Sequence, residues 1–175
     1  MSTGSAKMSV LIGEQFACIR ISGRANFSSS IDFRTLVNEL RLRGFSYFVL
    51  DLSNCVLMDS TFLGVLAGFG LKVNPGHNGS KLLCIELLNT NARITELLEN
   101  LGVLNLFKLT HGPLKLPEGT ETLPHTAATP TREEVTRNCL DAHKTLMEIN
   151  PDNVPKFKEV TQFLAEDLKK LKSEA

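Results

Sequence analysis

The chain has 175 residues, of which 42% are hydrophobic and 22% are charged, and its 19 basic and 19 acidic side chains cancel. This length and composition suit one ordinary globular domain or one domain with an extension, and they supply a core without disulfides. Zero net charge argues against nucleic acid as the main partner, because phosphate binding needs a basic surplus. No apolar run can span a bilayer, so we expect no membrane insertion. Residues 1–7 lack the apolar core of a signal peptide and are predicted to be a disordered leader.

Cysteine and histidine usage argues against a metal site or an enzyme. The spacing of the four cysteines matches no metal or redox motif, and without a secretion signal they favour a reducing cytoplasm. The four histidines sit singly, in loops or on a polar helix face, and no pair has a ligand spacing. No nucleophile–base set or acid–base pair stands out, so we expect a non-enzymatic protein without metal or other cofactor. The residues concerned are Cys18, Cys55, Cys84, Cys139, His77, His111, His125 and His143.

The first part of the chain predicts alternating strands and helices. Two short β-type runs around the turn GEQ predict a hairpin over residues 9–21. A helix should follow, because Ser29 and Asp32 have the spacing of a capping box and Gly44 can end the helix. The apolar run SYFVLDL, residues 46–52, has the length of a buried strand. The apolar stripe of the helix consists of Phe33, Leu36, Val37 and Leu40.

The alternation continues to about Thr110. The segment SNCVLM, residues 53–58, is expected to be a crossover to a helix that begins after Asp59. The following segments are a loop (73–81), a strand (82–87), a helix (from Asn89 or Thr90 to Gly102) and a short strand (105–109). The order β-β-α-β-α-β-α-β implies right-handed crossovers and a mostly parallel sheet.

The character of the chain changes after residue 110. Residues 111–131 are rich in proline and threonine and predict a linker. Residues 132–175 predict an αα-hairpin, with a capping box at Thr131 and Glu134 and a break at the sequence NPDN. Two narrow apolar stripes cannot form a stable domain alone, so the hairpin must pack on the first domain, on a second copy or on a partner. The stripes are Val135, Cys139, Ala142, Leu146 and Ile149, and then Phe157, Val160, Leu164, Leu168 and Leu171.

The candidate site is the segment Asp59-Ser60-Thr61-Phe62, between a buried strand and an apolar helix. Asp59 or Ser60 can cap that helix by accepting a hydrogen bond from its first turn. An isolated D-S-T before a helix needs no further explanation, because short motifs recur by accident.

The surrounding pattern resembles the STAS domain, the fold of the bacterial anti-sigma factor antagonists. The segments VLDLSNC and MDSTFLGVLAG are similar to the family's strand ending in D-L-S and its D-S-[ST]-G-L-G motif. IRISGRANF and LLCIELLNTNARITELLENLGVLNLF are similar to further family elements, and the match spans residues 8–110. The resemblance implies a STAS-like (SpoIIAA-like) mixed sheet with helices mainly on one face. The C-terminal hairpin is an addition to it.

The resemblance also implies a function. Family members are partner-switching modules in transcription regulation, phosphorylated on the serine after the aspartate by a kinase that is also the anti-sigma factor. A PPM-type serine phosphatase reverses the modification. The phosphorylated position falls on Ser60, with Thr61 as fallback acceptor. Partner docking is expected at Asp59, Ser60, Thr61, Phe62 and Asn26.

A phosphate on Ser60 would act as a switch without unfolding the domain. A helix N-terminus tolerates phosphate, but a charge of about −1.5 to −2 beside Asp59 would prevent an apolar partner from docking. Phe62 departs from the family pattern, which has glycine at this position. It can shield Ser60 from a kinase, anchor another partner or belong to the core.

The helix after Asp59 needs a cover on its outer side. Residues 61–71 carry no charge, and a helix that is apolar all round is buried on more than one side. Either the C-terminal hairpin in the same chain or a partner chain covers it, and a homodimer through the hairpin remains open. The alternative function is a STAS scaffold or ligand-binding subunit of a larger signalling or transport assembly, without phosphorylation.

Overall fold

The computed structural model describes residues 5–73, 84–127 and 129–174. The strands are β1 (Lys7–Ile12), β2 (Phe16–Ala25), β3 (Tyr47–Asp51), β4 (Cys55–Met58), β5 (Ile85–Leu88), β6 (Lys108–Thr110) and β7 (Glu121–Leu123). The helices are α1 (Phe27–Leu42), α2 (Ser60–Val73), α3 (Ala92–Asn100), α4 (Arg132–Ile149) and α5 (Val154–Ser173), with short 3-10 turns at Leu104–Leu106 and Pro151–Asn153. No helix in these ranges is long and apolar enough to cross a membrane.

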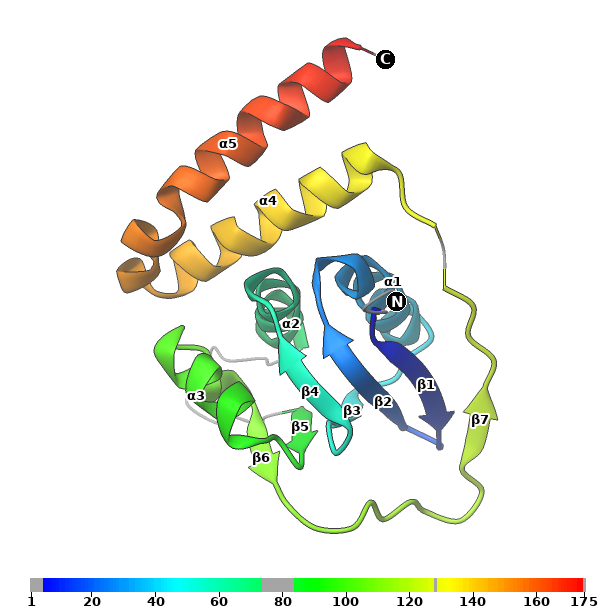
Figure 1. Ribbon diagram of the computed structural model, residues 1–175. Helices are drawn as coiled ribbons and strands as arrows, with labels where there is room; N and C mark the ends of the chain where they lie inside the picture. The colour runs from blue at the N-terminus through cyan, green and yellow to red at the C-terminus, as the bar shows by residue number, and fades with distance from the viewer. Residues whose placement is uncertain (1–4, 74–83, 128, 175) are drawn as a thin grey trace.

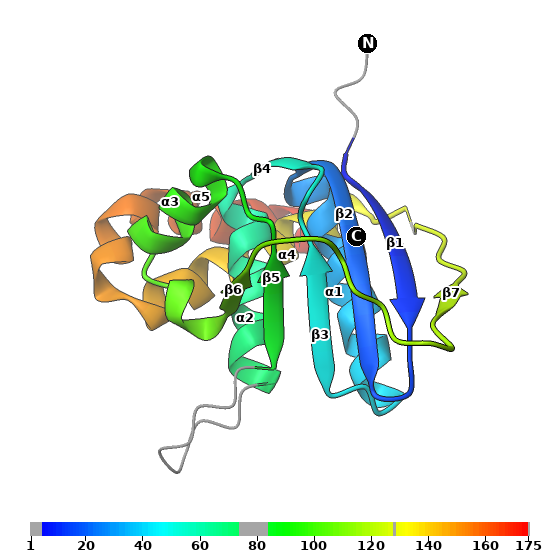
Figure 2. The same cartoon turned by 90° about the horizontal axis from the view of Figure 1, so that it is seen from below.

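The strands form one mixed sheet in the order β6-β5-β3-β2-β1-β7, with β4 paired to β2 beyond the end of β3. The β1–β2 and β1–β7 pairs are antiparallel and the others are parallel. Helices α1 and α2 cover one face of the sheet (Figures 1 and 2). The expected mixed sheet with helices mainly on one face is therefore present.

The main core lies between the sheet and these two helices. Period-two alternation directs Phe48 and Leu50 of β3 to this side. Three aromatic rings join the layers, since the ring of Phe69 on α2 lies 4.9 Å from Phe48 and 6.1 Å from Phe33 on α1. The site segment at the start of α2 is thus held on a rigid base.

One strand and one cap of the first domain differ from the sequence-based expectations. Residues 55–58 form β4 rather than a crossover, because the long β2 extends past β3 and leaves an edge at Gly23–Ala25 for pairing. Helix α1 begins three residues before the predicted box. Asn26 is its N-cap, accepting from the Ser28 and Ser29 amides, and the Asn26 amide in turn donates to Ser29 Oγ.

The predicted leader and linker are also partly structured. Ser5 forms a bridge with Arg24 and β1 begins at Lys7, so residues 5–7 are not disordered. Inside the predicted linker, β7 pairs with the edge of β1. The loop expected over residues 73–81 lies, after Val73, outside the described residues.

The first part of the linker, a strap of residues 111–117, crosses the face of the sheet opposite α1 and α2 (Figure 2). Leu114 of this strap packs on Cys18, Val49 and Leu88, which form a second, small core. Burial raises the pKa of the Cys18 thiol to about 12, as expected of an apolar filler.

The C-terminal hairpin folds onto its own chain. Helix α4 lies against α2 and α1, and α5 lies on the outer side of α4 (Figure 1). Asn153, at the joint of the hairpin, is fully buried, and its amide donates to the carbonyls of Leu101 and Leu146 at 2.9 Å each. The outer face of α2 is therefore covered in cis.

Candidate functional site

Asp59 connects the first turns of α1 and α2. One of its carboxylate oxygens accepts from the Phe62 amide at 2.8 Å, which makes Asp59 the cap of α2. The other oxygen accepts from the Phe27 amide at 2.7 Å, in the first turn of α1. Its backbone amide donates to Ala25, next to Asn26. The structure thus brings together Asp59 and Asn26, and the predicted cap is confirmed.

Ser60 is the first residue of α2, and its hydroxyl lies 2.8 Å from Nε2 of His143 on α4. Nδ1 of His143 lies 2.7 Å from the Cys139 carbonyl, which can only accept a hydrogen bond. In the neutral form of the ring, this contact places the proton on Nδ1 and leaves Nε2 to accept from Ser60. The ring is only 5% exposed and packs at 5.0 Å from the ring of Phe157.

Thr61, the fallback acceptor, lies beneath α4. Its side chain is buried, and its hydroxyl donates to Cys139 Sγ at 3.7 Å. Burial, opposed in part by this hydrogen bond, raises the pKa of the Cys139 thiol. Thr61 is therefore less accessible than Ser60 in this arrangement.

Phe62 is a core residue, so its expected place on a docking surface is wrong. The side chain is fully buried, and its ring lies 5.0 Å from the ring of Phe33. At the third position of α2 it faces the sheet rather than the side that carries α4. Cys55 is also buried in the core, and this burial raises the pKa of its thiol to about 11.

A glycine and an alanine set the close approach of α4 to α2. A Cβ added at Gly64 would lie 2.7 Å from Ala142 Cβ and would also overlap the Ala142 carbonyl oxygen. A Cβ at Gly68, one turn later, would meet only Thr145, at 3.7 Å. The glycines of α2 therefore serve helix packing, and Gly64 is the position where nothing larger fits.

The contact between α4 and α1 is polar. Asn138 is buried, and its amide donates to the Ser30 hydroxyl at 2.8 Å. Arg34 donates to Asn138 Oδ1 at 3.4 Å and lies 3.9 Å from Asp141. The end of the hairpin over the site is thus held by hydrogen bonds as much as by apolar contact.

Two histidines have roles that their sequence context did not indicate. The sequence predicts single histidines in loops or on a polar helix face, but His143 is four residues after Cys139 and three before Leu146, which puts it on the apolar stripe of α4. This spacing on the helix is the sequence signal that could have identified His143.

His125 lies 2.8 Å from Asp32 on α1 and holds the segment before α4 on the domain. No group in the described ranges has three His, Cys, Asp or Glu residues placed to hold a metal ion.

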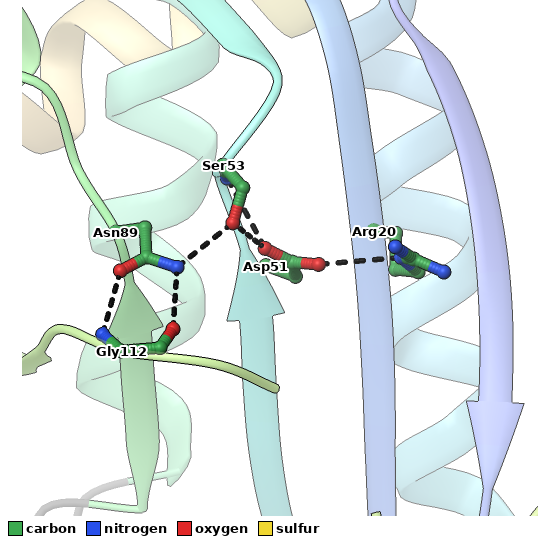
Figure 3. A network of polar contacts seen from close by, with 5 residues as sticks. All are labelled: Arg20, Asp51, Ser53, Asn89 and Gly112. Carbon is green, nitrogen blue, oxygen red and sulfur yellow. Dashed lines mark hydrogen bonds and ion pairs between the residues drawn. The ribbon is translucent and has the colours of Figure 1, made fainter. Parts of the chain in front are cut away.

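A polar network lies at the carboxyl ends of β3 and β5 (Figure 3). Asp51, buried at the end of β3, accepts from Arg20 Nε at 3.2 Å and from the Ser53 amide at 3.1 Å. Asn89, which has φ +59°, donates to Ser53 and exchanges two hydrogen bonds with the backbone of Gly112. The D-L-S segment therefore helps to fix the start of the strap.

The fold is that of the STAS domain, the SpoIIAA-like fold. A crystal structure of an anti-sigma factor antagonist from Mycobacterium paratuberculosis matches 60% of this chain and 85% of its own, with 15% identity and a TM-score of 0.50. The anti-sigma factor antagonist SpoIIAA, unphosphorylated, matches 61% of this chain and 88% of its own, with 13% identity and a TM-score of 0.48. The Bacillus cell fate determinant SpoIIAA in its phosphorylated form matches 61% of this chain and 91% of its own, with 13% identity and a TM-score of 0.45. No protein-family model and no curated protein matches the sequence.

Proposed function

We propose that this chain is a non-enzymatic regulatory module of the anti-sigma factor antagonist kind, which changes partners when Ser60 is phosphorylated. The observation that carries the proposal is the position of Ser60, in the first turn of α2 directly after the cap Asp59. The fold that holds this serine is also that of the Mycobacterium paratuberculosis anti-sigma factor antagonist.

The electrostatics of this position suit a reversible charge. The N-terminus of a helix favours negative charge, so the domain can accept a phosphate there without unfolding. The same phosphate would stand beside the Asp59 carboxylate, and a partner docked on this end of α2 would have to bury it. Modification would then abolish binding while the fold survives.

The partners in this proposal are a serine kinase that is also an anti-sigma factor, and a PPM-type phosphatase that restores the hydroxyl. The chain would act in the bacterial cytoplasm, in transcription regulation. Asp59 and Asn26, which lie side by side between α1 and α2, would form the part of the docking surface next to Ser60.

Affinity capture from the native host, followed by phosphosite mapping, tests the proposal. The tagged full chain should capture a serine kinase, and phosphate should map to Ser60 and disappear in Ser60→Ala. Ser28→Ala is the matched control, since Ser28 is an exposed serine in the first turn of α1. Ser60→Asp should weaken kinase binding. Phosphate found only elsewhere, or undiminished binding by Ser60→Asp, would contradict the proposal.

A second candidate function is a STAS scaffold or ligand-binding subunit that is not phosphorylated. The hydrogen bond between Ser60 and His143 under α4 favours it, because the serine is already occupied within the chain. A homodimer would use the outer side of α5, where Phe163 is 69% exposed. Native mass spectrometry separates the candidates by showing copy number and any co-purifying small molecule.

A further inference from the structure

The α4–α5 hairpin has few anchors in the main core. Among the described residues of the hairpin, Leu146 is the one fully buried member of that core, with Ile149 and Phe157 packed against it from the side. The other buried side chains of α4 are a second leucine, an alanine and three polar residues, and each polar one is hydrogen-bonded. They are Thr136, Asn138, Leu140, Ala142 and His143.

Part of the surface of α2 that α4 covers carries hydroxyls or no side chain. It includes the hydroxyl-bearing Ser60 and Thr61 and also Gly64 and Gly68, which face Ala142 and Thr145. Lifting α4 would expose the apolar side chains of Leu140 and Leu146 but not those between the sheet and α1, so the hairpin can open as a unit separate from the sheet core. The sheet and its core with α1 and α2 would stay intact.

The closed arrangement leaves no room for a phosphate where the Ser60 hydroxyl now points. Its hydroxyl oxygen and His143 Nε2 are at hydrogen-bond distance, 2.8 Å, and no phosphorus atom with its oxygens fits between them. The Cys139 carbonyl, which holds Nδ1, and the ring of Phe157, which packs against the imidazole, restrict how far the His143 ring can turn aside. A phosphate would have to displace the ring and α4 with it.

We propose that the hairpin is a detachable cap over the start of α2, and that the closed cap and a phosphate on Ser60 exclude each other. A kinase would then reach Ser60 only in the open form, and modification would keep the chain open. The part of this proposal that concerns phosphate rests on the proposed function, whereas the detachable cap is independent of it.

A pair of matched glycine variants of the full chain tests the cap. Gly64→Ala pushes against the backbone of α4, whereas Gly68→Ala meets only a methyl group at ordinary distance. The readout is alkylation of Cys139 by iodoacetamide under native conditions, with peptide mapping. Cys18 and Cys55, both buried within the sheet domain, report global unfolding in the same sample.

Cys139 should react on the order of tenfold faster in Gly64→Ala than in Gly68→Ala, because overpacking favours the open form. Cys18 and Cys55 should react as slowly as in the unchanged chain. Equal rates at Cys139 in both variants would overturn the proposal. A parallel rise at Cys18 and Cys55 would do the same, since the hairpin would then open only when the domain unfolds.

Phosphoserine incorporated at position 60 during synthesis tests the exclusion. Cys139 should again react on the order of tenfold faster than in the unmodified chain, and phosphoserine at position 28 should have no such effect. An unchanged rate with phosphoserine at position 60 would show that the phosphate fits under the closed cap. The phosphate is installed without a kinase, so this result is independent of the capture experiment that tests the proposed function.

Discussion

The hydroxyl of Ser60 is hydrogen-bonded to Nε2 of His143, a residue 83 positions later in the chain. This contact joins the site predicted from the first domain to the extension that the STAS resemblance does not include. The serine that would carry a phosphate is therefore also one of the points at which the extension is held on the domain.

Replacing His143 should loosen α4. His143→Ala removes the acceptor of the Ser60 hydroxyl and the packing with Phe157, so hydrogen exchange along α4 should rise by on the order of tenfold. Exchange in β2 and β3 should not change. His111→Ala, at an exposed position, is the control. Unchanged protection of α4 would mean that this contact does not hold the hairpin.

Removing the Asp59 carboxylate should destabilise the whole domain. Asp59→Ala leaves the Phe27 and Phe62 amides without their acceptor, and we expect a loss of about 2 kcal/mol in the free energy of unfolding. Urea denaturation measures this loss. Asp152→Ala, at an exposed aspartate, should stay within about 0.5 kcal/mol of the unchanged chain. Equal effects of the two variants would argue against a double cap.

Truncating Phe62 should affect stability rather than a docking surface. Because the ring is fully buried against Phe33, Phe62→Ala should cost about 3–5 kcal/mol in the free energy of unfolding. Phe163→Ala, on the exposed side of α5, should cost little. If chemical denaturation showed Phe62→Ala to be as stable as Phe163→Ala, the assignment of Phe62 to the core would be wrong.

Glu86 should make stability depend on acid pH. Burial opposes the shift, but hydrogen bonds from Tyr47 and Thr110, at 2.6 and 2.7 Å, lower the pKa of Glu86. Its contribution is therefore present above the unfolded pKa, about 4.3, and is lost as pH falls through the lower folded value. Because the group is partly exposed, Glu86→Gln should cost at most about 1 kcal/mol at pH 7.

Urea denaturation should therefore be measured at several pH values from pH 7 to below about pH 4. The difference in stability between the Glu86→Gln variant and the unchanged chain should narrow as the pH falls. The pKa of the Tyr47 hydroxyl shifts in the opposite direction. Burial, and then its hydrogen bond to Glu86, raise its pKa to about 12, so its contribution falls only in strong base. A constant difference across the acid range would show that Glu86 does not titrate as described.

Much of the fold was predictable because its signals are local. The cap Asp59 and the helix ends at Gly44 and Gly102 follow from hydrogen bonds and backbone angles within a few residues, and both glycines have positive φ. The apolar period of α4 and α5 predicted a hairpin, and the resemblance over residues 8–110 predicted the sheet. These features are determined by the sequence itself.

Other features of the protein were decided by the tertiary structure alone. β4 and β7 exist because β2 and β1 present free edges, which a short segment cannot reveal about itself. Phe62 lies inside because Phe33, from another helix, receives its ring. His143 reaches Ser60 because Gly64 lets α4 approach α2 closely. Each depends on a partner distant in sequence, and only packing brings such partners together.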